Sequence, residues 1–201
     1  MIPAATAIVL GLVATAHAQP ARPIGDKLIY FGPRVGFDTA WLGGADIRKQ
    51  QYEERIGAHV GGFVMFAFTP LLGAETGLFF AQKGNAFPNG AFKYDYLQLP
   101  LLGLVRATIG RNVRVRGVYG ATLNLNVRSR LVAGEVDVKI NDVTTPFDLG
   151  LVLGVGIESL TQYGVIIFDA HYEHGLRTID DSMEHEDVKN RGITVSAGFG
   201  F

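Results

Sequence analysis

The feature that most constrains this chain is an alternation of apolar residues with polar or small ones, which recurs eight times. The clearest example, 113–126, places Val113, Tyr119 and Leu123 on one face and Arg114 and Asn124 on the other. A period of two is typical of a β-strand with one apolar face. No stretch between these segments has the period of an amphipathic helix. The eight segments are 28–39, 56–68, 72–83, 94–106, 113–126, 147–158, 165–174 and 193–201.

The connections between these segments alternate in length. Short turns are expected at Thr69-Pro70, around Gly110-Arg111-Asn112 and over Ser159 to Gln162. Short turns on one rim and long loops on the other are typical of bacterial outer-membrane barrels, whose long loops lie outside the cell. The last segment then pairs with the preceding strand and with the first, which closes the barrel. The expected long loops are Leu42 to Arg55, Gly84 to Lys93, Ser129 to Pro146 and Arg177 to Gly192.

The beginning of the sequence is expected to be a signal peptide. Ala4 to Ala16 is apolar or small and carries no charge, and Ala16-His17-Ala18 has the form of a signal-peptidase site. We therefore predict cleavage after Ala18 (signal peptide 1–18), export, and one mature barrel domain over 19–201. The alternative is a short buried apolar segment.

Composition excludes several classes of protein. There is no cysteine, so no disulfide framework stabilises the chain. A net charge of −1 provides no basic field for nucleic acid. After the signal peptide, no uncharged apolar run is long enough for a membrane-spanning helix, so membrane insertion would require strands.

Two barrel architectures fit the alternation, and they differ in which face is outside. In a soluble, lipocalin-like cup the apolar face lines a cavity, whereas in a membrane barrel it faces lipid. The polar face carries many glycines and charges of both signs, which suit a narrow lumen. The aromatic residues fall in two bands, as membrane interfaces favour. They are Phe31, Phe66, Phe68, Tyr163, Phe199 and Phe201 near one rim, and Phe37, Trp41, Phe80, Tyr94, Phe147 and Tyr172 near the other.

We therefore predict an all-β fold, an eight-stranded antiparallel up-and-down transmembrane β-barrel. Eight strands leave an interior that side chains fill, so a solute channel is not expected. Arg114 and Arg116 should both point into the lumen and must find carboxylates there. Because its strand lies beside theirs, Glu158 is the expected partner of Arg114 or Arg116. Further residues expected to fill the lumen are Tyr30, Phe63 and Gln98.

Three motifs carry a family resemblance. The segment 72–84 (LGAETGLFFAQKG) resembles the third-strand motif of the PorT-like outer-membrane β-barrel domain family, and 96–102 (YLQLPLL) is similar to its YLEIPLLL strand. The segment 169–176 (DAHYEHGL) resembles its D-A-R-Y-x-x-G-L pattern. The resemblance implies an outer-membrane location and a barrel fold, but no chemistry. Gln98 and His171 each stand where the family usually has a charged residue.

The sequence gives only weak support for a catalytic or metal site. Asp169, His171 and Ser196 are expected to point inward from neighbouring strands and could form a triad. In a narrow lumen, however, every inward polar side chain has polar neighbours, so we predict no catalytic residue and no enzyme. His171 and His174 do not share a face, so no metal or cofactor site is expected. The remaining candidate ligands are His185, Glu184, Glu186 and Asp187 in the last loop.

These observations predict a non-enzymatic integral outer-membrane protein, a structural scaffold whose extracellular loops serve binding or adhesion. The alternatives are a barrel enzyme that acts on outer-membrane lipid and a soluble, lipocalin-like carrier of an apolar ligand. The protein should reside in the outer membrane of a Gram-negative bacterium as a monomer. Its expected partners are outer-membrane lipid, the barrel-assembly machinery and an unknown extracellular ligand or protein, with no nucleic acid.

Overall fold

The computed structural model describes residues 27–43, 53–87, 89–134, 136–140, 146–176 and 189–201. The predicted signal peptide, 1–18, lies outside the described residues. No helix in the described part of the chain is long and apolar enough to cross a membrane. The strands are β1 (Ile29–Gly43), β2 (Glu53–Phe66), β3 (Leu72–Phe87), β4 (Gly90–Ile109), β5 (Val113–Ala133), β6 (Val136–Lys139), β7 (Phe147–Leu160), β8 (Val165–Gly175) and β9 (Lys189–Gly200).

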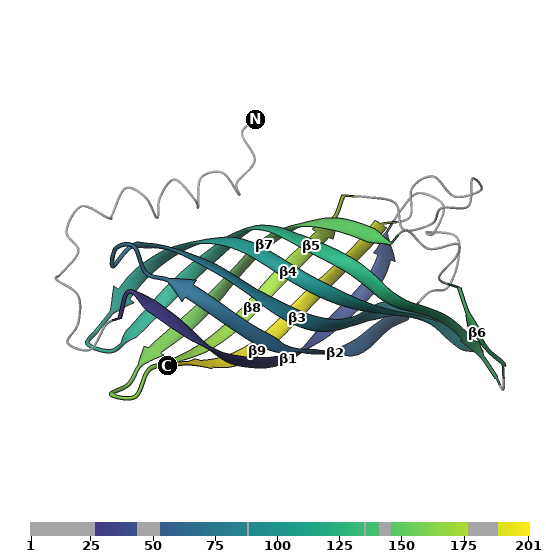
Figure 1. Ribbon diagram of the computed structural model, residues 1–201, viewed down its shortest axis with the longest axis horizontal. Helices are drawn as coiled ribbons and strands as arrows, with labels where there is room; N and C mark the ends of the chain where they lie inside the picture. Colours follow the sequence, from purple (N-terminus) through teal and green to yellow (C-terminus); the bar gives the residue numbers. More distant parts are fainter. Residues whose placement is uncertain (1–26, 44–52, 88, 135, 141–145, 177–188) are drawn as a thin grey trace.

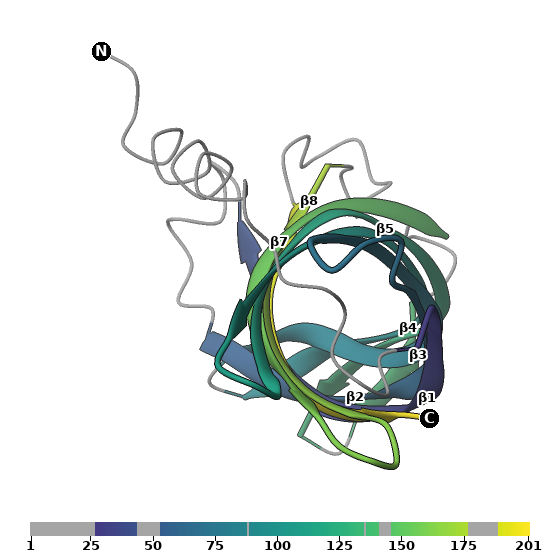
Figure 2. The same ribbon diagram turned by 90° about the vertical axis from the view of Figure 1, so that its left-hand side faces the viewer.

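The strands form one antiparallel sheet that closes on itself (Figure 2). Its order is β4-β3-β2-β1-β9-β8-β7-β5-β6, and a further pairing between β4 and β5 completes the ring. Eight strands therefore make the barrel, and β6 lies outside it. The predicted fold class, an eight-stranded antiparallel barrel that closes through its first and last strands, is confirmed. Closure leaves the barrel wall without a free strand edge.

Three short turns lie at one rim, which is the left end in Figure 1. They connect β2 to β3, β4 to β5 and β7 to β8, as the sequence predicted. The chain also ends here: Phe201 N donates a hydrogen bond to Phe31 O at 2.9 Å. The other strand ends lie at the opposite end of the barrel, which we call the long-loop rim.

Two of the four predicted long loops are wrong. The segment Gly84 to Lys93 is not a loop, because β3 continues to Phe87 and β4 begins at Gly90. The segment Ser129 to Pro146 contains the end of β5 and all of β6. We call this projecting sheet the rim extension. It consists of residues 84–87 of β3, 90–95 of β4, 128–133 of β5 and all of β6, and it projects from the right end in Figure 1.

The prediction missed the rim extension because cross-strand pairing, not alternation within one segment, holds these residues in a sheet. β4 and β5 remain paired from Ile109↔Val113 at the turn to Gly90↔Ala133 at the tip. A register shift at Asp95/Tyr96 marks a β-bulge in β5, which interrupts the regular pattern there. Parts of the other two predicted loops, 44–52 and 177–188, lie outside the described residues.

The apolar face of the barrel lies outside, as predicted for a membrane barrel. On β7, Leu153 and Val155 are 64% and 67% exposed, whereas Glu158 on the other face is fully buried. Arg34 and Glu75 are likewise buried in the lumen. A lipocalin-like cup requires the opposite arrangement, with the apolar face around an internal cavity, so the structure does not support that alternative.

The aromatic bands are largely as predicted, with one correction. At the long-loop rim, Trp41 packs against Tyr172 with ring centroids 6.4 Å apart. At the short-turn rim, Phe199 and Phe201 make an edge-to-face contact at 4.9 Å. Tyr94 was assigned to the outer band, but its side chain is buried. It lies on the inner face of β4 because strand alternation gives it the same direction as Tyr96, and the two rings lie 6.5 Å apart.

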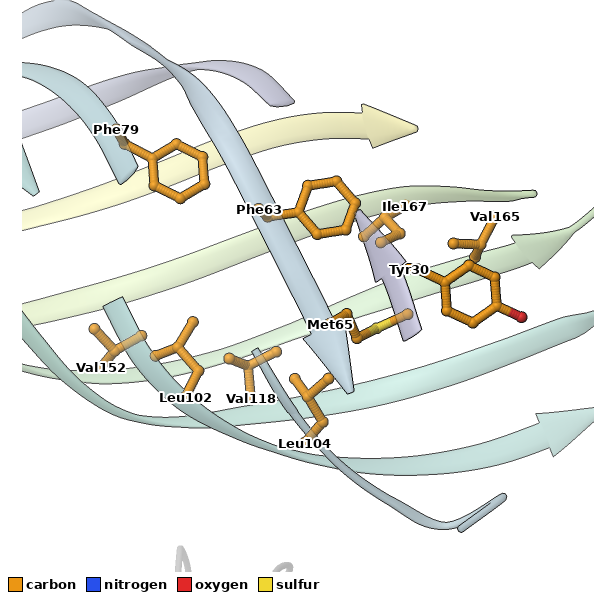
Figure 3. Close-up of a cluster of buried hydrophobic side chains, with 10 residues drawn as sticks. All are labelled: Tyr30, Phe63, Met65, Phe79, Leu102, Leu104, Val118, Val152, Val165 and Ile167. Carbon is orange, nitrogen blue, oxygen red and sulfur yellow. The ribbon is translucent and has the colours of Figure 1, made fainter. Parts of the chain in front are cut away.

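An apolar cluster fills the lumen near the short-turn rim (Figure 3). Tyr30 and Met65 are paired neighbours on β1 and β2, and both are fully buried. The Tyr30 hydroxyl accepts a hydrogen bond from Lys27 N at 2.8 Å, so its polar end is not isolated. The predicted placement of Tyr30 and Phe63 inside the barrel is confirmed. The cluster comprises Tyr30, Phe63, Met65, Phe79, Leu102, Leu104, Val118, Val152, Val165 and Ile167.

Candidate functional site in the barrel lumen

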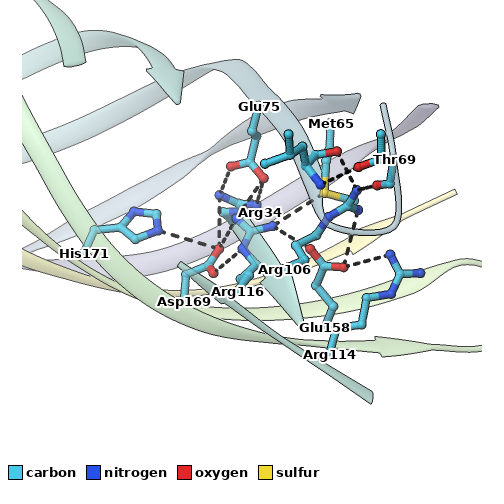
Figure 4. Close-up of polar contacts among 11 residues, drawn as sticks. Arg34, Met65, Thr69, Glu75, Arg106, Arg114, Arg116, Glu158, Asp169 and His171 are labelled. Atoms are coloured by element: carbon cyan, nitrogen blue, oxygen red, sulfur yellow. Dashed lines mark hydrogen bonds and ion pairs between the residues drawn. The ribbon is translucent and has the colours of Figure 1, made fainter. Parts of the chain in front are cut away.

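Charged side chains from six strands meet in the half of the lumen near the short-turn rim (Figure 4). We call this group the lower network. All of its members are buried, so charges of both signs must satisfy one another inside the barrel. It comprises Arg34 on β1, Glu75 on β3, Arg106 on β4, Arg114 and Arg116 on β5, Glu158 on β7 and Asp169 on β8.

Glu75 is held by two guanidinium groups. Arg34 binds it in a bidentate manner, with Nη1 2.6 Å from Oε1 and Nη2 2.9 Å from Oε2. Arg116 Nη2 donates to the same Oε2 at 2.9 Å. The Arg34 guanidinium also lies 4.5 Å from the centre of the Phe63 ring, a cation–π contact that joins the lower network to the apolar cluster.

Arg116 contacts all three carboxylates of the lower network. Besides Glu75, its Nε and Nη2 lie 2.8 and 2.9 Å from the two oxygens of Asp169. Its Nη1 lies 3.4 Å from Glu158 Oε1. The planar guanidinium can bind several carboxylates at once because its N–H groups point in different directions, which a lysine cannot reproduce.

The predicted pairing of Glu158 is confirmed for both arginines. Glu158 Oε2 lies 3.5 Å from Arg114 Nη1, and Glu158 Oε1 contacts Arg116. Arg106 Nη1 adds a longer contact to Glu158 at 3.8 Å. The sequence analysis did not single out Arg106, although it shares the inward face of β4 with Gln98. Arg106 Nη2 also donates to Thr69 O at 2.7 Å, which connects the lower network to the β2–β3 turn.

Glycines on β7 provide the space that this network needs. A Cβ on Gly156 would collide with the carboxylate of Asp169, and one on Gly154 would collide with the His171 ring. Both partners lie on the adjacent strand β8 and point inward. The glycines of the polar face therefore allow large side chains from β8 to lie against β7, as expected for a narrow lumen.

A second group, the upper network, lies nearer the long-loop rim and is built around Glu173. Lys83 Nζ donates to Glu173 Oε2 at 2.8 Å, and Gln98 Nε2 donates to the same oxygen at 2.9 Å. The other oxygen, Oε1, accepts from Asn124 Nδ2 at 2.8 Å and from Thr122 Oγ1 at 3.0 Å. A buried carboxylate with four donors is well satisfied.

Little open space remains between the two networks. A cavity of about 30 Å³ lies there, with room for about two water molecules. Its lining includes His59 and His171. The His59 ring stacks on Phe79 at 4.7 Å, and its Nδ1 lies 3.4 Å from Asp38. Side chains of the two networks therefore occupy most of this part of the lumen.

The candidate triad is only partly assembled. His171 Nε2 lies 3.8 Å from Asp169 Oδ2, and Asp169 is committed to Arg116. Ser196 is a cross-strand neighbour of Asp169, but no hydrogen bond joins it to His171 among the described residues. A serine nucleophile needs a base within hydrogen-bonding distance, so this arrangement gives no activated hydroxyl.

The candidate metal ligands do not converge in the described part of the chain. His171 points into the lumen, whereas His174 lies on the outer face with its ring 6.4 Å from that of Tyr172. The described residues contain no group of three or more side chains suited to hold a metal ion. The other candidates, Glu184, His185, Glu186 and Asp187, lie outside the described residues.

The closed antiparallel barrel, its apolar outer face and its charged, filled lumen define the class of a membrane-spanning β-barrel. The chain matches the family described as "Outer membrane protein beta-barrel domain" over residues 17–181. It therefore belongs to this family of outer-membrane barrel proteins. Curated proteins include no match to the chain.

Solved structures include several barrels of similar fold. Neisserial surface protein A superposes with a TM-score of 0.50 at 14% identity, over 85% of this chain and 97% of that chain. OprG from Pseudomonas aeruginosa gives 0.48 at 16% identity, over 90% and 99%. Ail, the attachment invasion locus protein of Yersinia pestis, gives 0.47 at 16% identity, over 86% and 98%. At an identity of 14%, the likeness to Neisserial surface protein A supports the fold alone.

Proposed function

We propose that this protein is a non-enzymatic scaffold of the outer membrane that presents its long-loop rim for binding or adhesion. The observation that carries the proposal is the filled lumen, in which two charge networks lie on either side of a cavity of only about 30 Å³. On this proposal the barrel neither conducts solutes nor acts as an enzyme, so its function lies at the rims. Binding residues commonly lie on connections that a rigid scaffold positions.

The family membership and the apolar wall support the proposed location. We infer export with cleavage after Ala18 and insertion by the barrel-assembly machinery as a monomer. The resemblance to PorT-like barrels supports a narrower assignment within the family. The long-loop rim would then lie at the cell surface, because bacterial outer-membrane barrels keep their short turns in the periplasm.

Cell fractionation tests the location. The protein should be recovered in the outer-membrane fraction and should migrate differently on a gel before and after heating, as folded barrels do. Recovery in the soluble periplasm without detergent would contradict the proposal.

Lipid analysis tests the absence of enzymatic activity. A barrel enzyme that acts on outer-membrane lipid is the competing function, and His171 and Ser196 are its best candidate residues. Cells that express His171→Ala or Ser196→Ala should have the same lipid A and phospholipid profiles by mass spectrometry as cells that express the parent protein. A change in those lipids that follows either substitution would establish the enzyme instead.

A further inference from the structure

A row of basic side chains crosses the rim extension. Lys93 on β4 lies opposite Arg130 on β5, which in turn lies opposite Lys139 on β6. Directly opposite residues of an antiparallel pair project from the same face of the sheet, so these three cations share one face. On the other side of Lys93 the row continues to Gly84 on β3. The Arg55 guanidinium lies beside that glycine and donates from Nη1 to Lys83 O at 2.7 Å.

This row lies on the outer face, continuous with the lipid-facing wall. On β4 the side chains of Tyr94 and Tyr96 are buried inside the barrel. Lys93 and Asp95 alternate with them along the strand and therefore project outward. Among the described residues, this face contains four cations, Lys93, Arg128, Arg130 and Lys139, and two carboxylates, Asp95 and Asp137, an excess of two positive charges.

Both carboxylates of this face are engaged. Asp137 Oδ2 accepts from Arg130 Nη1 at 3.0 Å, on the exposed edge of the extension. Asp95 is buried, accepts from Gln82 Nε2 at 3.2 Å and lies opposite Arg128. Lys93 and Lys139 make no ion pair within the described residues. The row therefore retains basic groups that are able to bind an external anion.

The height of the row relative to the membrane indicates what that anion is. The last fully apolar row on the same strands runs through Phe80, Leu97, Leu125 and Phe147, which are successive cross-strand partners. Lys93 precedes Leu97 by four residues along β4, which is about 13 Å of strand and less along the tilted barrel axis. Lipid headgroups begin directly beyond the hydrocarbon core, so the basic row lies at headgroup level.

We propose that this basic row is a docking surface for the phosphate groups of an anionic lipid in the outer leaflet. The phosphates would lie against Lys93 and Lys139, and the acyl chains would lie along the apolar wall below. Adjacent strands are about 4.8 Å apart, so one headgroup with two phosphates can contact several members of the row. The inference rests on the proposed function, because it needs the long-loop rim to face the cell exterior.

The test compares two variants with the same loss of charge in the full chain folded in detergent. Lys93→Gln/Lys139→Gln removes two cations of the row, and Lys27→Gln/Arg111→Gln removes two exposed cations from the short-turn rim. Native mass spectrometry measures the binding of bisphosphorylated lipid A, with dephosphorylated lipid A as the chemical control. The row variant should bind the bisphosphorylated lipid about tenfold more weakly. The rim variant should bind it like the parent protein.

Three results would overturn the proposal. They are equal weakening in the two variants, equal binding of the two lipids by the parent protein, and displacement of lipid A by inorganic phosphate at matched phosphate concentration. The last result would show a site for free phosphate rather than for a lipid headgroup. The heat-dependent gel shift of each variant reports folding separately. A parent protein that is recovered from cells as a soluble, unshifted band would refute the proposed location instead.

Discussion

Both networks in the lumen satisfy buried carboxylates, but they use different kinds of hydrogen-bond donor. The lower network places four arginines against three carboxylates, and each carboxylate is shared between at least two guanidiniums. The upper network has one central carboxylate, Glu173, which one lysine and three neutral side chains satisfy. Loss of one carboxylate therefore leaves several charges uncompensated in the lower network but only one in the upper.

This difference indicates that the barrel's stability is most sensitive to substitutions in the lower network. Its members come from six strands, including β1 and β8, so it ties distant parts of the wall together across the lumen (Figure 4). Buried ion pairs contribute little net stability when complete, yet their disruption is costly because it leaves an isolated charge. The comparison thus predicts an order of effects for the carboxylates.

The largest effect is expected for Glu75→Gln. This substitution leaves Arg34 without its bidentate partner and removes one of the three carboxylates around Arg116, so unfolding free energy should fall by about 3–5 kcal/mol. Urea unfolding of the barrel in detergent micelles, followed by the heat-dependent gel shift, measures the change.

The double variant Glu75→Gln/Arg34→Met is the matched control for that prediction. Because it removes the arginine that depends most on Glu75, it should recover part of the lost stability. If the two substitutions were simply additive, the buried pair would not be the reason for the loss.

A smaller effect is expected for Glu173→Gln in the upper network. Gln98, Asn124 and Thr122 are neutral and can bond to an amide, so only Lys83 loses a charged partner. The free energy of unfolding should fall by about 2 kcal/mol. The same urea titration measures it, and a loss as large as that of Glu75→Gln would remove the distinction between the two networks.

The smallest effect is the coupling between Glu158 and Arg114. Their contact of 3.5 Å is longer than those around Glu75, and Glu158 also contacts two other arginines. A double-mutant cycle with Glu158→Gln and Arg114→Met should give a coupling free energy of about 1 kcal/mol. A coupling of zero within error would show that this pair acts independently despite its proximity.

Much of this arrangement could be predicted from the sequence because residues in a barrel wall alternate between the inward and the outward face. Alternation by two assigned the inward face of β5 and β7 correctly, and the adjacency of those strands then brought Arg114 and Arg116 to Glu158. The same rule places Arg106 on the inward face, because it lies eight residues after Gln98 on the same strand. The prediction overlooked it because the segment was treated as ending there.

The rim extension and the partners of Arg116 could not be predicted in the same way. Glu75 and Asp169 reach Arg116 across the lumen, and contacts between non-adjacent strands depend on the shear of the barrel, which alternation does not reveal. The rim extension depends on pairing between segments that each look polar, as at Lys93 and Arg130. Sequence alternation therefore identifies faces, whereas register and closure determine which side chains meet.

Ion conductance in a planar lipid bilayer tests the central claim most directly, because both networks are inferred to close the lumen. The folded parent protein should insert and show no stable conductance steps in symmetric salt. Insertion can be verified independently by the heat-dependent gel shift of the reconstituted protein. Steady conductance of the inserted parent protein would contradict the filled lumen and the scaffold function proposed from it.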